Sequence, residues 1–67
     1  MEIEVLGMLG GNYIIIEVDG DAAPVQVSSP EELRDHLRNR GLTERQITKA
    51  IEALKPEPRR IRLTIKS

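Results

Sequence analysis

Residues 2–8 alternate between apolar and polar residues, and residues 13–19 are rich in Ile and Val. Leu9-Gly10-Gly11-Asn12 lies between the two stretches. Alternation with a period of two indicates β-strands, and Gly-Gly supplies the positive φ angles that a two-residue hairpin turn requires. The pattern therefore predicts a β-hairpin whose turn is Gly10-Gly11.

A turn at that position also fixes the register of the hairpin, because it places Met8 opposite Tyr13 and Leu6 opposite Ile15. Parity then assigns both strands to faces. The predicted core face carries aliphatic residues and one glycine: Ile3, Val5, Gly7, Ile14, Ile16 and Val18. The predicted outer face carries the remaining residues of the two strands: Glu2, Glu4, Leu6, Met8, Tyr13, Ile15, Glu17 and Asp19.

The middle of the chain predicts a short strand followed by a helix. Residues 25–27 form the strand, which the preceding Pro24 confines to a sheet edge or to the start of a strand. The segment Ser29-Pro30-Glu31-Glu32 is typical of a helix N-terminus, with a serine cap, a proline at the first helical position and a capping box. We expect this helix to reach about Arg40, where Gly41 ends it.

A second helix is expected directly afterwards. Thr43 and Gln46 have the spacing of a capping box, and apolar residues recur at helical spacing as far as Leu54. The two prolines in residues 55–58 end the helix. Residues 59–66 then alternate again, with three aliphatic residues expected inward: Ile61, Leu63 and Ile65.

The order of elements is strand, strand, strand, helix, helix, strand, which predicts one α+β domain spanning residues 1–67. A helical connection back to the first strand favours a mixed four-stranded sheet of order 3-2-1-4, with the last strand parallel to the first and both helices on one face. This outline resembles the β-grasp fold. The resemblance concerns the fold only and implies no function.

Composition limits the chain to one small domain with an aliphatic core. Its 67 residues are 39% hydrophobic and 31% charged, and they include no Cys, Trp or Phe and a single Tyr. A chain of this length buries only about 60% of its unfolded surface and has no room for a second core. No signal peptide and no apolar run long enough to span a bilayer can be recognised, so we expect a cytoplasmic protein without membrane contact.

Charge is unevenly distributed, although the formal net charge is only −1. Residues 1–32 carry seven acidic and no basic residues, whereas residues 33–67 carry ten basic and four acidic residues. In the predicted sheet order, Arg60 and Arg62 lie beside Glu2 and Glu4. We therefore expect the two halves to neutralise each other within the folded sheet.

The outer face of the predicted hairpin provides the first candidate site. Near the turn it would present an apolar cluster of four residues: Leu6, Met8, Tyr13 and Ile15. Such a cluster would expose a few hundred Å² of apolar surface, with a tyrosine as the kind of anchor that interfaces favour. It predicts binding of a protein partner, or self-association into a homodimer, provided that no bulge or loop conceals it.

The basic last strand provides an alternative site, in which Arg59, Arg60, Arg62 and Lys66 would contact the phosphates of a nucleic acid. A sequence pI of about 5.8 and a single aromatic residue do not fit the usual pattern of such domains. The favoured explanation is that Arg60 and Arg62 pair with Glu2 and Glu4 and that Lys66 protects an exposed edge strand from aggregation. The protein-binding hypothesis is therefore favoured over the nucleic-acid hypothesis.

Residues suited to catalysis or metal binding are few. The single histidine, His36, is expected to be solvated on the polar side of the first helix, and Ser29 is explained by helix capping. Asp19-Gly20-Asp21 lacks the further ligands of a calcium loop and is explained by a turn. The sequence thus predicts a non-enzymatic interaction module without cofactor, metal or small-molecule substrate. A designed domain without activity is a further alternative, because the helix signals agree so consistently.

Overall fold

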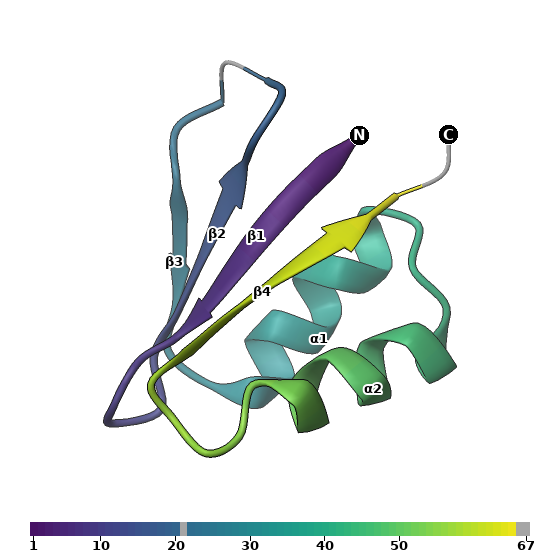
Figure 1. The fold of residues 1–67 in the computed structure, drawn as a ribbon. Coiled ribbons are helices and arrows are strands. Elements are labelled where there is room, and N and C mark those ends of the chain that lie inside the picture. The colour runs from purple at the N-terminus through teal and green to yellow at the C-terminus, as the bar shows by residue number, and fades with distance from the viewer. Residues whose placement is uncertain (21, 66–67) are drawn as a thin grey trace.

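A computed structural model describes residues 1–20 and 22–65 of the chain. Four strands form one sheet in the order β3-β2-β1-β4, and the elements follow the predicted sequence (Figure 1). The strands are β1 (Glu2–Gly7), β2 (Tyr13–Glu17), β3 (Val25–Val27) and β4 (Arg59–Thr64). The helices are α1 (Pro30–Asn39) and α2 (Glu44–Ala53). The α+β class and the 3-2-1-4 order predicted from the sequence are confirmed.

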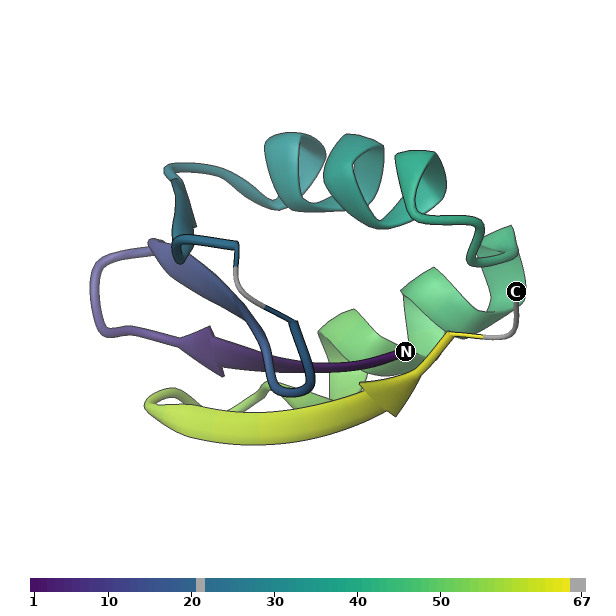
Figure 2. The same cartoon turned by 90° about the horizontal axis from the view of Figure 1, so that it is seen from above.

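Both helices lie on the same face of the sheet, so the other face carries no second layer (Figure 2). Their ends follow from local sequence. The hydroxyl of Ser29 accepts a hydrogen bond from the N–H of Glu32 at 3.2 Å, and Thr43 forms a complete capping box with Gln46. Gly41 has a φ angle of 101°, which favours glycine and ends α1.

The predicted hairpin register is wrong by one residue. Gly7 lies opposite Tyr13, and the N–H of Met8 donates to the carbonyl of Asn12 at 2.8 Å. The loop therefore contains three residues, 9–11, instead of two. Because side chains alternate along a strand, this difference moves every side chain of β2 to the opposite face.

The burial of Tyr13 accounts for the observed register. Gly7 lies opposite Tyr13 and points toward the helical layer, where a Cβ atom would lie 3.5 Å from Leu54 and 3.4 Å from Glu57. In this register Tyr13 is only 2% exposed. Burying a tyrosine removes a larger apolar area from water than burying any of the neighbouring aliphatic residues. The only aromatic residue in the chain is thus part of the core.

The buried tyrosine also has a polar partner. Its hydroxyl donates a hydrogen bond to a carboxylate oxygen of Glu57 at 3.5 Å. Glu57 lies in the loop that leads into β4. Burial, together with the nearby charge of Glu57, raises the pKa of Tyr13 above its ordinary value. The hydroxyl therefore stays protonated throughout the neutral range. The other buried core residues are aliphatic: Ile3, Val5, Ile15, Val27, Leu33, Leu37, Leu42, Ile47, Ala50, Leu54 and Ile65.

The direction of β4 is the second correction, because β4 runs antiparallel to β1 and not parallel to it. All pairs in the sheet are consequently antiparallel, and the sheet is not mixed. The helical hairpin explains the difference. Its first helix carries the chain along the sheet and its second returns it, so β4 starts at the end of the sheet where β3 finished. A single crossover helix would have produced the parallel strand and the β-grasp outline.

Candidate functional site

The four residues predicted to form an outer apolar cluster do not lie together. Tyr13 and Ile15 point into the core and are each 2% exposed. Leu6 is half-buried on the outer face, and Met8 lies in the hairpin loop with 39% of its surface exposed. The predicted patch is therefore wrong, because it depended on the two-residue turn.

Other apolar residues occupy the outer face instead. Ile14 lies opposite Leu6, and Ile16 lies opposite Glu4. All three aliphatic side chains of this group are half-buried, although no helix covers this face. The outer face thus presents only a narrow aliphatic strip, which lies directly beside charged side chains of β1.

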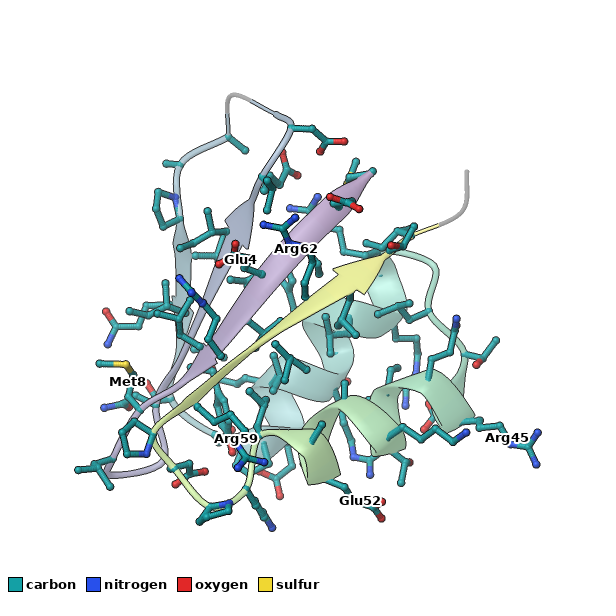
Figure 3. All side chains as sticks on the ribbon, viewed as in Figure 1. Glu4, Met8, Arg45, Glu52, Arg59 and Arg62 are labelled. Atoms are coloured by element: carbon teal, nitrogen blue, oxygen red, sulfur yellow. The ribbon has the colours of Figure 1, made fainter. Side chains whose placement is uncertain are left out.

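The basic residues of β4 form ion pairs with β1, as the charge pattern predicts. Arg62 lies 3.0 Å from Glu4 (Figure 3) and 3.5 Å from Glu2. Arg60 lies 3.6 Å from Glu4. The hydrogen bond that Arg62 donates to Glu4, together with the charges of both glutamates, raises the pKa of Arg62. Arg59 is exposed and donates to the carbonyl of Lys55 at 3.3 Å. Lys66 lies outside the described residues.

The outer edge of β4 carries a row of backbone N–H and C=O groups that no strand among the described residues binds. Met1 and Ile65 exchange two backbone hydrogen bonds, of 2.8 and 3.3 Å, across the β1–β4 pair. In an antiparallel pair such bonds recur at every second residue, so residues 59, 61, 63 and 65 direct their N–H and C=O groups toward β1. Arg60, Arg62 and Thr64 direct theirs away from it. No strand among residues 1–20 and 22–65 pairs with that side of β4.

A groove with a volume of about 480 Å³ follows this edge on the helix side. Residues 61–64 of β4 form one wall, and α2 with its preceding turn forms the other. The residues from the helix side are Leu42, Gln46, Lys49, Ala50 and Ala53. The groove is thus apolar along most of its length and borders the free backbone edge directly.

The groove lies where the helical layer leaves the β4 edge of the sheet incompletely covered. Ile3 and Val5 of β1 are completely buried, whereas their cross-strand neighbours Leu63 and Ile61 remain half-buried. On α2, the residues facing β4 include small alanines, which leave the space beside the strand open. Ile61 and Leu63 therefore offer aliphatic surface that the domain does not use fully for its own core.

Lys49 is the charged residue that lines the groove from α2, whereas the side chain of Arg62 lies on the outer face with Glu4. No acidic residue of the described chain lines the groove. A smaller hollow of about 290 Å³ lies at the start of β4, where Leu6 and Met8 meet Arg59 and Arg60. The edge of β4 therefore combines aliphatic surface on the groove side with arginine side chains on the outer side, which suits a ligand that is apolar and negatively charged.

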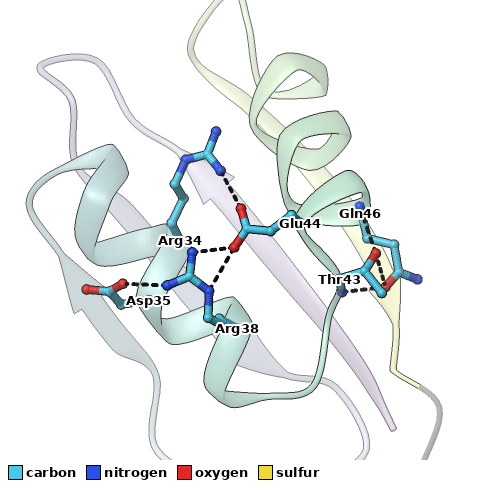
Figure 4. A network of polar contacts seen from close by, with 6 residues as sticks. All are labelled: Arg34, Asp35, Arg38, Thr43, Glu44 and Gln46. Atoms are coloured by element: carbon cyan, nitrogen blue, oxygen red, sulfur yellow. Dashed lines mark hydrogen bonds and ion pairs between the residues drawn. The ribbon is translucent and has the colours of Figure 1, made fainter.

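An ion-pair network holds the two helices together at the start of α2 (Figure 4). Glu44 lies 3.2 Å from Arg34 and also contacts Arg38, which pairs with Asp35 at 3.5 Å. These side chains are largely exposed, so each pair adds only about 0.2–1 kcal/mol to stability. The pairs of Glu44 with Arg34 and Arg38 link α1 to the start of α2, the helix that forms one wall of the groove.

His36 is not solvated, contrary to the sequence-based expectation. It is half-buried in α1, and its Nε2 atom is enclosed without a hydrogen-bond partner among the described residues. Burial, and to a lesser degree the charge of Arg40, lowers the pKa of His36. His36 does not line the groove.

The lowered pKa of His36 predicts a pH-dependent stability. The unfolded chain binds a proton at about pH 6.5, whereas the folded chain resists protonation. The free energy of unfolding should therefore fall as the pH drops below that value, and it should level off below the folded pKa. Urea unfolding between pH 8 and 5.5 measures this slope. His36→Gln should remove most of it, and an unchanged slope in that variant would show that other groups are responsible.

Comparisons with protein-family models, curated protein sequences and solved structures found no match to this chain. Within the described residues, no helix is both long and apolar enough to cross a membrane, and no three His, Asp or Glu side chains are grouped so that they could hold a metal ion. The geometry of the edge of β4 and its groove is therefore the basis for a functional proposal.

Proposed function

We propose that this chain is a non-enzymatic protein-interaction module that binds an extended segment of a partner protein as an additional strand along β4. The single observation that supports the proposal is the coincidence of a free strand edge with an apolar groove beside it. Strand addition of this kind takes affinity from main-chain hydrogen bonds and specificity from pockets for alternate side chains. The cytoplasmic location expected from the sequence remains a prediction.

The chemistry of such binding follows from the direction of the free groups. The N–H and C=O groups of Arg60, Arg62 and Thr64 would pair with the added strand, each bond contributing about 0.5–1.5 kcal/mol net. Ligand residues opposite Ile61 and Leu63 would place their side chains over the groove. Burying one aliphatic side chain there contributes about 1.5–3 kcal/mol. Because the ligand loses conformational freedom, we expect a transient complex of small interface area.

The structure offers less support for the two surfaces proposed from the sequence. The outer aliphatic strip of Leu6, Ile14 and Ile16 is half-buried and has no adjacent free backbone edge. Arg60 and Arg62 are already paired with glutamates, which reduces the positive charge available to nucleic-acid phosphates. We therefore place the interaction at the edge of β4 and retain the expectation that the chain has no catalytic activity.

A displayed library of random eight-residue peptides tests the proposal, with enriched peptides then titrated into the ¹⁵N-labelled protein. We expect shifts of backbone resonances in residues 60–64 and along the facing side of α2. Thr64→Pro removes an outward N–H that makes no bond to β1, so it should preserve the fold and weaken binding about tenfold, since one lost bond within a small interface costs about 1.4 kcal/mol.

Two further variants make the experiment specific. Ala53→Trp fills the groove from the exposed side of α2 and should also weaken binding, whereas Thr64→Ala keeps the N–H and should bind normally. Shifts confined to Leu6, Ile14 and Ile16 would instead place the interaction on the outer face. Binding that Thr64→Pro leaves unchanged would contradict strand addition.

A further inference from the structure

The inner edge of β4 already binds a strand of a distinctive pattern, namely the chain's own β1. Glu4 lies opposite Arg62 and Val5 lies opposite Ile61, so acidic residues of β1 face outward beside the arginines and aliphatic residues face the core. The side chain of Arg62 donates a hydrogen bond of 3.0 Å to Glu4, so β4 contacts an acidic residue of β1 through an arginine. The strand is thus complementary to alternating acidic and aliphatic residues.

The free edge of β4 has the same alternation. A ligand residue opposite Arg60 or Arg62 would share their face of the sheet, whereas a residue opposite Ile61 or Leu63 would face the groove. The side chains of Arg60 and Arg62 remain 70% and 55% exposed despite their pairs with β1. A guanidinium group has five N–H donors, so each arginine can bind a second carboxylate on its other side.

Repulsion from the glutamates of β1 does not cancel this attraction. Neighbouring strands are about 4.8 Å apart, so an added strand would lie about 10 Å from β1 with β4 between them. That distance exceeds the Debye length of about 8 Å at physiological ionic strength, whereas the contact with arginine is direct. Lys49 adds positive charge on the groove side, where no acidic residue of the described chain lines the wall.

A second copy of this chain fits the edge less well. Antiparallel self-pairing of β4 centred on Arg62 would place two arginines opposite each other, and centring on Ile61 would place Arg60 opposite Arg62. Like charges directly opposite are destabilising. The charge of the strand therefore favours an acidic ligand over self-association.

We infer that the segment bound along β4 alternates acidic and aliphatic residues, with at least two acidic residues separated by one aliphatic residue. Arg60 and Arg62 bind the acidic side chains, and the groove between β4 and α2 takes the aliphatic ones. The inference rests on the proposed strand addition and specifies the chemistry of its partner. The pattern Glu2-Ile3-Glu4-Val5 of the chain itself is an example of such a segment.

Three capped synthetic peptides of identical length test this inference: acetyl-TEVEVET-amide, acetyl-TSVSVST-amide and acetyl-TKVKVKT-amide. We expect the glutamate peptide to bind about fivefold more tightly than the serine peptide, since each of two exposed ion pairs adds a modest amount. The lysine peptide should bind more weakly than the serine peptide. The preference should shrink as salt is raised.

An Arg60→Gln/Arg62→Gln variant provides the matched control, because it lacks the two guanidinium groups that are inferred to bind the acidic side chains. The ratio of its affinities for the glutamate and serine peptides should fall to about one, and this ratio is the readout because the two arginines also pair with β1. Equal binding of all three peptides, abolished by Thr64→Pro, would overturn the acidic specificity and leave strand addition standing. Peptide binding that Thr64→Pro does not affect would instead contradict the proposed function. A dimer detected by light scattering and abolished by Thr64→Pro would overturn the choice of an acidic ligand over a second copy of the chain.

Discussion

Replacing Tyr13 by alanine is expected to lower the free energy of unfolding by about 3–5 kcal/mol. Tyr13 is 2% exposed and lies opposite Gly7 of the adjacent strand. Domains of this size have a total stability of about 3–10 kcal/mol, so the variant should be largely unfolded at room temperature. Urea unfolding followed by circular dichroism measures the change.

Tyr13→Phe is the matched control, because it keeps the ring and removes only the hydroxyl bonded to Glu57. We expect it to lose about 1 kcal/mol, the usual net contribution of one hydrogen bond. A loss of less than about 1 kcal/mol for Tyr13→Ala itself would indicate a tyrosine outside the core. It would thereby support the two-residue turn over the three-residue loop.

A second large effect is expected for Ile15 compared with its neighbour Ile14. Ile15 points into the core and is 2% exposed, so Ile15→Ala should cost about 2–5 kcal/mol. Ile14 is half-buried on the outer face, opposite Leu6, and Ile14→Ala should cost about 1 kcal/mol. Both substitutions replace isoleucine by alanine. A difference between their midpoints of urea unfolding therefore reports which face of the sheet each side chain occupies.

The order of those two losses tests the register of the hairpin directly. The sequence-based register places Ile14 inside and Ile15 outside, and it predicts the reverse order. Similar losses at both positions would contradict both registers. Successive side chains of a β-strand point to opposite faces of the sheet, and the helices cover only one face.

Elements, helix ends and strand order could be predicted from the sequence because each depends on local signals. Ser29 and Thr43 cap their helices as their spacing with Glu32 and Gln46 indicates. The ion pairs between β1 and β4 were predictable from the segregation of charge along the chain. Tertiary packing was not needed for any of these inferences.

The register of β2 could not be predicted, because the run Ile14-Ile15-Ile16 makes both faces of the strand aliphatic. Parity then depends entirely on the loop, and the glycines allow two loop lengths: Gly10 and Gly11 have positive φ angles in the three-residue loop as well. The observed register buries Tyr13, whose hydroxyl bonds to Glu57 in the connection between α2 and β4. That burial involves a part of the chain that the pattern of the hairpin does not contain.

The candidate site was only partly predictable. The 3-2-1-4 order already makes the last strand an edge strand, and Ala50 and Ala53 already mark a helix side with small residues. What the sequence does not contain is the lateral position of α2 relative to β4. The groove depends on that position, and the ion pairs of Glu44 with α1 help to set it.

The two edges of the sheet differ in a way that limits assembly. β3 is only three residues long and follows Pro24, whereas β4 provides six residues. A short edge next to a proline is a poor template for a further strand. Under the proposed strand addition, each molecule would accept a strand on one side only, so complexes should stop at one ligand per domain and should not propagate into fibrils.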